Sequence, residues 1–296
     1  PEDPAALADV VDAHHVFGRV QPHQKRAMVK ALQAKGHVVA MTGDGVNDVL
    51  ALKDADIGIA MGSGSSASRA AAQLVLLDGR FATMPGVVAE GRRVINNIQR
   101  VANLFLTKTT YSMLLALSVG VIGVSFPFLP RHLTLVGSLT IGIPAFFLAL
   151  APNRHRARAG FVPRVLRFAV PAGTLAAIVT LVAYAIAHAD DAVSLDQART
   201  VATLTLVSTG LCILVRLAQP FNAWRKALVL SMIGLFVATL VLPPARAFFA
   251  LELPPPYLYG VVAALVLAQE LVWRAIRGRV LPPEPDDDPT ASAPPG

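Results

Sequence analysis

Three polar side chains, those of Asp44, Asn47 and Asp48, lie within five residues of one another. The apolar run 38–41 before them has the length of a short buried strand, and residues 49–54 after them favour a helix. The N–H groups at the start of such a helix attract anions, but two carboxylates repel a bare phosphate unless a hard cation lies between them. Mg²⁺ takes oxygen ligands and commonly bridges carboxylates to phosphate. The spacing therefore predicts a magnesium-dependent phosphate site.

The segment that holds these residues resembles a known family motif. Residues 42–48 (Thr-Gly-Asp-Gly-Val-Asn-Asp), together with residues 51–62, are closely similar to the hinge motif of P-type cation-transporting ATPases. The similarity is long and position-specific. The alternative is an acidic loop of some other α/β enzyme.

The resemblance assigns roles within this motif. It implies that Asp44 ligates Mg²⁺ directly and that Asp48 supports the metal site from the next turn. Asn47 would hydrogen-bond near the phosphoryl group. Structural roles remain open for two of them, since Asp48 would also favour a helix start and Asn47 would also stabilise a turn. The cofactor-binding backbone of the same site would be that of Thr42, Gly43 and Gly45, because glycine lets the chain turn sharply beside a ligand.

A second motif occupies residues 19–25 (Arg-Val-Gln-Pro-His-Gln-Lys). In the resembled family, a lysine at the Lys25 position contacts the phosphoryl group, where a point positive charge offsets developing negative charge. The alternative is a solvated helix face that carries Lys25, Arg26 and Lys30. Together the two motifs predict a catalytic set of Lys25, Asp44, Asn47 and Asp48.

The sequence departs from the family pattern in two places. Most cation pumps have Ala-Pro after the second aspartate, whereas this chain has Val49 and Leu50, which puts the subfamily in doubt. The family also places an Asp-Lys-Thr-Gly phosphorylation motif and a nucleotide-binding domain before the hinge, and no Asp-Lys-Thr-Gly occurs here. We therefore expect a C-terminal fragment or a truncated product without ATPase activity of its own. The Gly/Ser-rich residues 62–66 favour a simple connector over a flexible loop that caps a ligand.

Composition limits the classes of protein that fit. Hydrophobic residues make up 54% of the 296 positions and charged residues only 15%, with a mean hydropathy of +0.55. The net charge of +7 does not indicate nucleic-acid binding, because the arginines cluster between long apolar runs. The single cysteine, Cys212, lies inside such a run and favours a small buried hydrophobe.

The first 93 residues alternate apolar runs with helical patterns, which favours a parallel sheet covered on both faces. In such sheets the site lies beyond the carboxyl ends of the strands, where Asp44 falls. This part resembles the second half of a haloacid dehalogenase-like phosphorylation domain. The expected strands are 15–20, 37–41, 57–61 and 74–77, and the expected long helix is 22–35.

The remainder, residues 94–280, predicts a transmembrane domain of six helices. Each apolar stretch has about the 20 residues that a bilayer core requires. Residues 90–100 run into the first stretch without a helix breaker, so one continuous helix should connect the two domains. The Pro-rich tail 281–296 favours disorder. The predicted spans are near 102–126, 132–151, 166–187, 199–218, 225–243 and 257–274.

The charges between the spans predict an orientation. Basic connectors alternate with an acidic one, so the positive-inside rule places the first domain and the C-terminus in the cytoplasm. The predicted location of the spans is the plasma membrane. The basic residues that decide this are Arg154, Arg156, Arg158, Arg164, Arg167, Arg216, Arg225, Lys226, Arg274, Arg277 and Arg279, and the acidic ones are Asp190, Asp191 and Asp196.

A transport path needs polar oxygen at mid-membrane. Pro144 has no N–H and should free the carbonyl of Thr140 four residues earlier, and a broken membrane helix is tolerated where it lines a polar cavity. Related pumps break the same span at a similar Gly-X-Pro, although an acidic residue stands there where this chain has Ile141. Lys108 fits either a built-in counter-charge or a snorkelling lysine. The predicted path consists of Thr109, Ser112, Ser138, Thr140 and Pro144.

The sequence thus predicts an α/β domain with a partial haloacid dehalogenase-like parallel sheet, followed by a six-helix transmembrane bundle. The resemblance implies the C-terminal part of a ten-span, bacterial calcium-pump-like P-type ATPase. Its cofactors would be Mg²⁺ and ATP, the latter bound mainly by the absent domain. Its partners would be a transported cation, the lipid bilayer and the N-terminal part of the pump. The alternatives are a membrane-tethered phosphatase and a non-catalytic remnant that binds partner subunits.

Overall fold

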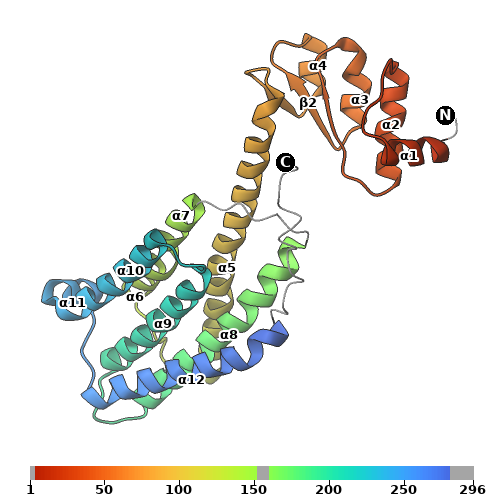
Figure 1. Ribbon diagram of the computed structural model, residues 1–296. Helices are drawn as coiled ribbons and strands as arrows, with labels where there is room; N and C mark the ends of the chain where they lie inside the picture. Colours follow the sequence, from red (N-terminus) through yellow and green to blue (C-terminus); the bar gives the residue numbers. More distant parts are fainter. Residues whose placement is uncertain (1–3, 152–159, 281–296) are drawn as a thin grey trace. The chain divides into compact units, whose positions relative to one another are not determined.

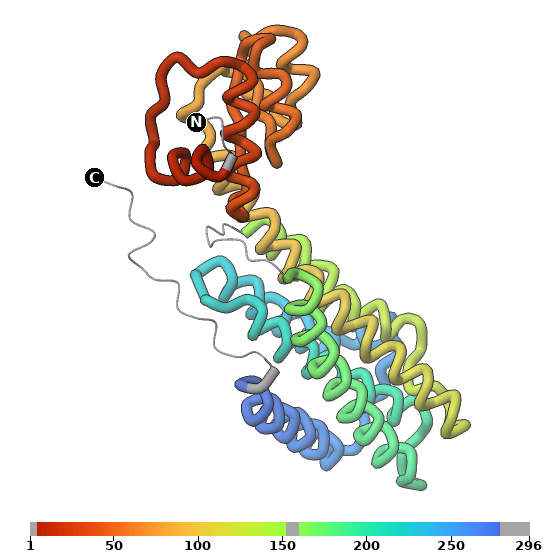
Figure 2. The backbone as a smooth tube through the Cα atoms, turned by 90° about the vertical axis from the view of Figure 1, so that its right-hand side faces the viewer, coloured from red at the N-terminus to blue at the C-terminus, as the bar shows by residue number. Residues whose placement is uncertain are grey.

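The computed structural model describes residues 4–151 and 160–280, and the chain divides into two compact units, Pro1–Val88 (unit 1) and Ala89–Gly296 (unit 2). Figure 1 and Figure 2 show unit 1 as a small α/β assembly and unit 2 as a bundle of long helices. The division follows composition, because only unit 2 carries apolar runs of membrane length.

Unit 1 is built on a parallel sheet. Within the described residues it has three strands in the order β1-β2-β3: β1 (Ala40–Gly43), β2 (Ile57–Met61) and β3 (Leu74–Leu76). Ala40 lies opposite Ile57, and Met61 lies opposite Leu76. The helices of this unit are α1 (Pro4–Ala13), α2 (Pro22–Ala34), α3 (Val49–Asp54) and α4 (Ser66–Ala71), with short 3-10 helices at Val46–Asp48 (η1) and Phe81–Thr83 (η2).

The local sequence explains most of these boundaries. Helix α2 starts at Pro22, whose fixed φ suits a first turn, and Gln21 and Gln24 form a capping box. Beyond its end, Gly36 has a φ of +84°, which only glycine adopts without strain. The fully buried Leu52 and Ile59 join α3 to β2. The predicted helix 22–35 and the strands near 57–61 and 74–77 are confirmed.

Two predicted strands are wrong or displaced. Residues 15–20 form no strand: Val16 is 90% exposed, and β1 pairs only with β2 in the part of the chain that the structure describes. An extended segment without a neighbour has no ladder to join. The strand expected at 37–41 begins later, at Ala40, because the N–H of Val39 donates to the Asp56 carboxylate at 2.8 Å.

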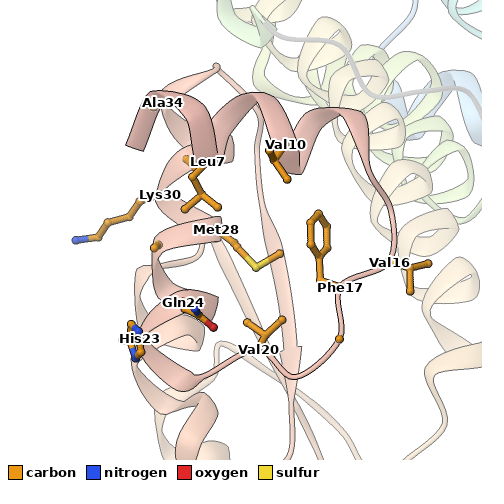
Figure 3. A pocket seen from close by; sticks show the side chains of 13 residues that line it. Leu7, Val10, Val16, Phe17, Val20, His23, Gln24, Met28, Lys30 and Ala34 are labelled. Carbon is orange, nitrogen blue, oxygen red and sulfur yellow. The ribbon is translucent and has the colours of Figure 1, made fainter. Parts of the chain in front are cut away.

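The apolar side chains of residues 15–20 border a cavity instead. This cavity of about 910 Å³ lies between α1, the 16–20 segment and α2. Figure 3 shows Val20 and Met28 facing it, and Val16 is also among the residues that line it. Residues 15–20 have the apolar pattern of a buried strand, but they pair with no strand in the described residues. Their apolar side chains line the cavity instead.

Unit 2 consists of long helices. Six helices in the described ranges are long and apolar enough to cross a membrane. Helix α9 packs against α6, α8, α10 and α12. In its most apolar 18-residue segment 67% is buried, compared with 17% in the corresponding segment of α12. The elements are α5 (Met84–Ile122), α6 (Pro130–Gly137), a π-helical turn η3 (Ser138–Gly142), α7 (Ile143–Leu150), α8 (Phe161–His188), α9 (Leu195–Leu217), α10 (Ala223–Val241), α11 (Pro243–Phe249) and α12 (Pro256–Val280).

Helix α5 confirms the prediction of one continuous helix. It begins at Met84, inside unit 1, and runs for 39 residues to Ile122, a length of about 58 Å at 1.5 Å per residue. Asn97 on this helix donates to the carbonyls of Ala149 and Ala151, at 3.0 and 2.6 Å. It thereby satisfies carbonyls that the end of α7 leaves without helical partners. The tail 281–296 and Arg154, Arg156 and Arg158 lie outside the described residues.

Candidate functional site

The first motif folds into a strand, a glycine turn and two short helices. Strand β1 ends at Gly43, η1 follows at Val46–Asp48, and α3 continues from Val49. A Cβ atom at Gly43 would lie 2.5 Å from the Cβ of Asp48, so no other residue fits there without displacing Asp48. The N–H of Gly45 points at the second Asp48 oxygen, at 3.4 Å. Glycine at position 43 thus lets Asp48 lie against the end of the strand.

Lys25 and Asp48, which are 23 residues apart, form an ion pair. The Nζ of Lys25 donates to Oδ1 of Asp48 at 2.7 Å, and their side chains are 36% and 8% exposed. Lys25 comes from α2 and Asp48 from η1, so the pair joins the two sequence motifs. A charge-assisted bond of this length orients both groups.

The other basic residues of α2 have a different partner. Arg26 binds the carboxylate of Asp54 at the end of α3, and Lys30 lies 3.6 Å from the same carboxylate. The hydrogen bond from Arg26 holds the pKa of Asp54 below its ordinary value. These contacts fix α2 on α3, which is what presents Lys25 to Asp48.

A buried serine fixes the loop at Asp44. The hydroxyl of Ser68 is fully buried and lies 3.1 Å from the carbonyl oxygen of Asp44 and 2.9 Å from that of Gly45. The N–H of Ser65 donates to the Asp44 carbonyl at 2.8 Å, and Gly64 approaches that carbonyl so closely that a Cβ would lie 2.8 Å from it. The Gly/Ser loop is therefore more than a connector, because it determines the conformation of the Asp44 turn.

Sequence reasoning missed Ser65 and Ser68. Their three-residue spacing is a signal, since Ser65 caps α4 by accepting a hydrogen bond from the N–H of Ser68 at 3.1 Å. Nothing in the sequence shows that the hydroxyl of Ser68 reaches a loop 24 residues away. Arg69 adds a second fastening, donating to the carbonyls of Gly62 and Gly64 at 2.8 and 2.9 Å.

The side chain of Asp44 remains available. It is exposed just beyond the carboxyl end of β1, and its carboxylate has no hydrogen-bond or ion-pair partner among the described residues. Asn47 is also exposed, while Thr42 is half-buried on β1, opposite Ile59. The described residues contain no group of three metal-ligating side chains. One or two carboxylates with waters suffice for Mg²⁺, so an unpartnered Asp44 fits that ion.

The predicted break in the second span is a π-helical turn. It lies between α6 and α7 and ends two residues before the buried Pro144. The hydroxyl of Thr140 is buried and donates to the Val136 carbonyl at 2.7 Å. Gly210 on α9 packs on this turn so closely that a Cβ there would lie 2.6 Å from Cγ2 of Thr140.

The other predicted path residues separate into two groups. Ser138 lines a cavity of about 480 Å³ together with Lys108 and Gly142. Thr109 is exposed and donates to the Phe105 carbonyl one turn earlier at 3.1 Å, while Ser112 is half-buried. The structure therefore brings Ser138 and Lys108 to one cavity and does not bring Thr109 to it.

Two buried polar groups in unit 2 are not among the predicted path residues. Thr107 is 2% exposed, and its hydroxyl has no hydrogen-bond partner among the described residues. Thr209 donates to the side-chain oxygen of the buried Gln269 at 2.9 Å, which joins α9 to α12. Glu270 on α12 forms an ion pair with Arg216 on α9. In a helix whose other residues are nearly all apolar, the sequence does not show which hydroxyl groups are buried and which are exposed.

The fold and the site define a class: a haloacid dehalogenase-like α/β unit joined to membrane-length helices. The family model for haloacid dehalogenase-like hydrolases matches residues 2–56, which include Lys25 and Asp44. The chain is 50% identical to the calcium-transporting ATPase CtpE of Mycolicibacterium smegmatis and 53% identical to CtpE of Mycobacterium tuberculosis, over 95% and 94% of its length. It is 37% identical, over 77% of its length, to the probable cation-transporting ATPase exp7 of Streptococcus pneumoniae.

The chain belongs to the P-type cation-transporting ATPases and is a multi-pass membrane protein. It spans 38%, 37% and 30% of the length of the three relatives named above.

Proposed function

We propose that this chain is the C-terminal part of an ATP-driven cation pump, in which Lys25, Asp44, Asn47 and Asp48 serve the transfer of a phosphoryl group to and from an aspartate outside the chain. The observation that carries this proposal is the Lys25–Asp48 pair, 2.7 Å long, in the same turn as an unpartnered Asp44 carboxylate. Phosphoryl transfer uses a fixed positive charge together with a carboxylate that can hold Mg²⁺.

Each residue of the site has a distinct task. Mg²⁺ bound at Asp44 would neutralise charge on the phosphoryl oxygens. Lys25 supplies a positive charge whose position Asp48 determines, so that little reorganisation is needed during the reaction. The exposed Asn47 amide offers a hydrogen bond to the phosphoryl group, and Ser68 keeps the Asp44 turn in place. Glycine at 43 and 45 leaves the backbone of the turn accessible.

The transport path in this proposal runs along the π-helical turn. Ser138, Thr140 and the residues before Pro144 offer hydroxyl and carbonyl oxygens. Ser112 on α5 contributes a further hydroxyl to the proposed path. A π-turn leaves backbone carbonyls without ideal partners and is common at functional sites. The names of the CtpE relatives support Ca²⁺ as the transported ion. The positive charge of Lys108 beside Ser138 favours release of that cation over tight binding.

We further propose that unit 1 and the C-terminus lie in the cytoplasm. The ends of α9 and α12 and the start of α10 carry Arg216, Arg225, Lys226, Arg274 and Arg277, whereas the α8–α9 connection carries Asp190 and Asp191. Such an asymmetry fits the positive-inside rule.

The test is transport by the full-length pump in sealed vesicles. ATP hydrolysis should rise with Ca²⁺ and stay low without it. Absence of stimulation by Ca²⁺, Mg²⁺, Mn²⁺, K⁺ and Na⁺ alike would contradict a cation pump. The isolated chain should not hydrolyse ATP. Turnover of a small phosphoester by that isolated chain would instead support a membrane-tethered phosphatase.

A further inference from the structure

A cavity of about 250 Å³ lies between the C-terminal ends of α9 and α12, far along the chain from the pump site. Its polar lining is mostly basic: Arg216 comes from α9, and Arg274 and Arg277 come from α12, with Glu270 as the one carboxylate. Formal charges therefore leave an excess of two positive charges. Neither Arg274 nor Arg277, both exposed, has a carboxylate partner in the described part of the chain.

Arg216 is held in place and incompletely satisfied. Its side chain is 15% exposed, one guanidinium nitrogen binds Glu270, and its Cζ lies 4.6 Å from the centroid of the Trp273 ring. A second guanidinium nitrogen, Nη1, is buried and has no hydrogen-bond partner among the described residues. Buried donors without an acceptor are uncommon in folded proteins. This guanidinium is positioned to receive an anionic oxygen.

The surroundings of the cavity indicate that this anion has a hydrocarbon part. Leu267, Leu271 and Val272 on α12 are 64%, 65% and 44% exposed beside the cavity residues. Val215 contributes an apolar wall, and the buried Trp273, which packs against Phe168, contributes another. Basic pockets between membrane helices typically bind lipid headgroups.

We propose that this cavity binds the phosphate headgroup of an anionic phospholipid whose acyl chains lie along the outer face of α12. Arg216 and the two exposed arginines receive the phosphate oxygens. The proposal is independent of the pump function, because it rests on no residue of unit 1 or of the π-helical turn.

The two tryptophans of the chain provide the measurement. With Trp224→Phe as background, Trp273 is the only tryptophan in the full chain. The protein is placed in vesicles that contain either brominated phosphatidylglycerol or brominated phosphatidylcholine, and quenching is titrated. We expect stronger quenching of Trp273 by the anionic lipid. Removing both charges with R274Q/R277Q should lower that preference by about five-fold per arginine, since each basic residue near a membrane surface contributes on the order of one kcal/mol.

Matched variants complete the test. R274K/R277K keeps the charges and should retain part of the preference, whereas Lys226→Gln removes a basic residue outside the cavity and should leave it unchanged.

Equal quenching by the two lipids, or an R274Q/R277Q protein with full preference, overturns the proposal. Loss of quenching with excess inorganic phosphate identifies a free-phosphate site instead. A higher preference after neutralising Asp286, Asp287 and Asp288 identifies the chain's own tail as the occupant, and both results overturn the lipid assignment.

Discussion

The Asp44–Asp48 turn of unit 1 and the π-helical turn of unit 2 satisfy their polar groups in opposite ways. In unit 1, Lys25 reaches Asp48 across 23 residues and Ser68 reaches Asp44 across 24. In unit 2, Thr109 and Thr140 bond to carbonyls only four residues earlier. At the first site the partners lie on other elements, whereas these two threonine hydroxyls bond within their own helix turn. Long-range contacts therefore fix the first site, and helix packing fixes the second.

The largest expected effect concerns catalysis at Asp44. In the full-length pump, Asp44→Asn should lower phosphoenzyme formation by about 100-fold or more, because removal of one group aimed at developing charge costs roughly that much. The fold should survive, since the Asp44 carboxylate has no partner in the described residues. The control is Asp78→Asn, an exposed aspartate of the same unit. Equal activity of the two variants would remove Asp44 from the mechanism.

The next effect concerns the Lys25–Asp48 pair. Lys25→Met leaves a carboxylate that is 8% exposed without its cation, which should destabilise unit 1 by about 1–3 kcal/mol, towards the lower end because Lys25 itself is 36% exposed. Hydrogen exchange of α2 in the full chain measures this. The double variant with Asp48→Asn should recover part of the loss. Lys30→Met, which removes a more exposed lysine, should change stability by less than about 0.5 kcal/mol.

Two glycine substitutions in unit 2 test whether helix packing fixes the π-helical turn. Gly210→Ala places a Cβ 2.6 Å from Thr140 Cγ2, whereas Gly234→Ala meets nothing within 4 Å. Overpacking of a well-packed interior costs typically about 1–3 kcal/mol. We expect Gly210→Ala to displace the π-helical turn and lower cation-stimulated ATP hydrolysis several-fold in the full pump, and Gly234→Ala to leave it unchanged. Equal effects would show that the turn does not depend on its packing against α9.

The smallest effect is a pH dependence in unit 1. Arg26 holds the folded-state pKa of Asp54 below its ordinary value of 3.8. The stabilisation from this carboxylate is therefore complete above pH 3.8 and lost as the pH falls through the folded-state pKa. Asp54→Asn should be less stable than wild type at neutral pH, and the difference should shrink below pH 3.8. Exchange of α2 and α3 amides, corrected for intrinsic rates, measures it. A constant difference would show that this carboxylate is not the titrating group.

Local patterns were sufficient for several elements. Pro22 and Gly36 mark the two ends of α2, and apolar periodicity locates β2, β3 and the membrane-length helices. The prediction of a strand at 15–20 was wrong, because an apolar run becomes a strand only when another strand lies beside it, and that depends on distant parts of the chain. The resemblance predicted a site of Asp44, Asn47, Asp48 and Lys25, but the contacts of Ser68 and the length of the Lys25–Asp48 contact required coordinates.

The amino-acid sequence by itself determined the order of the two units, the helix ends, the glycines of the turn and the residue types available for phosphate chemistry. Only the tertiary structure decided that Lys25 pairs with Asp48 while Arg26 pairs with Asp54, that Ser68 fastens the Asp44 turn, and that Arg216 lies over Trp273. The reason is physical: a dihedral preference or an apolar period acts over a few neighbouring residues. A contact between distant residues depends on how whole helices and strands pack, which no single segment encodes.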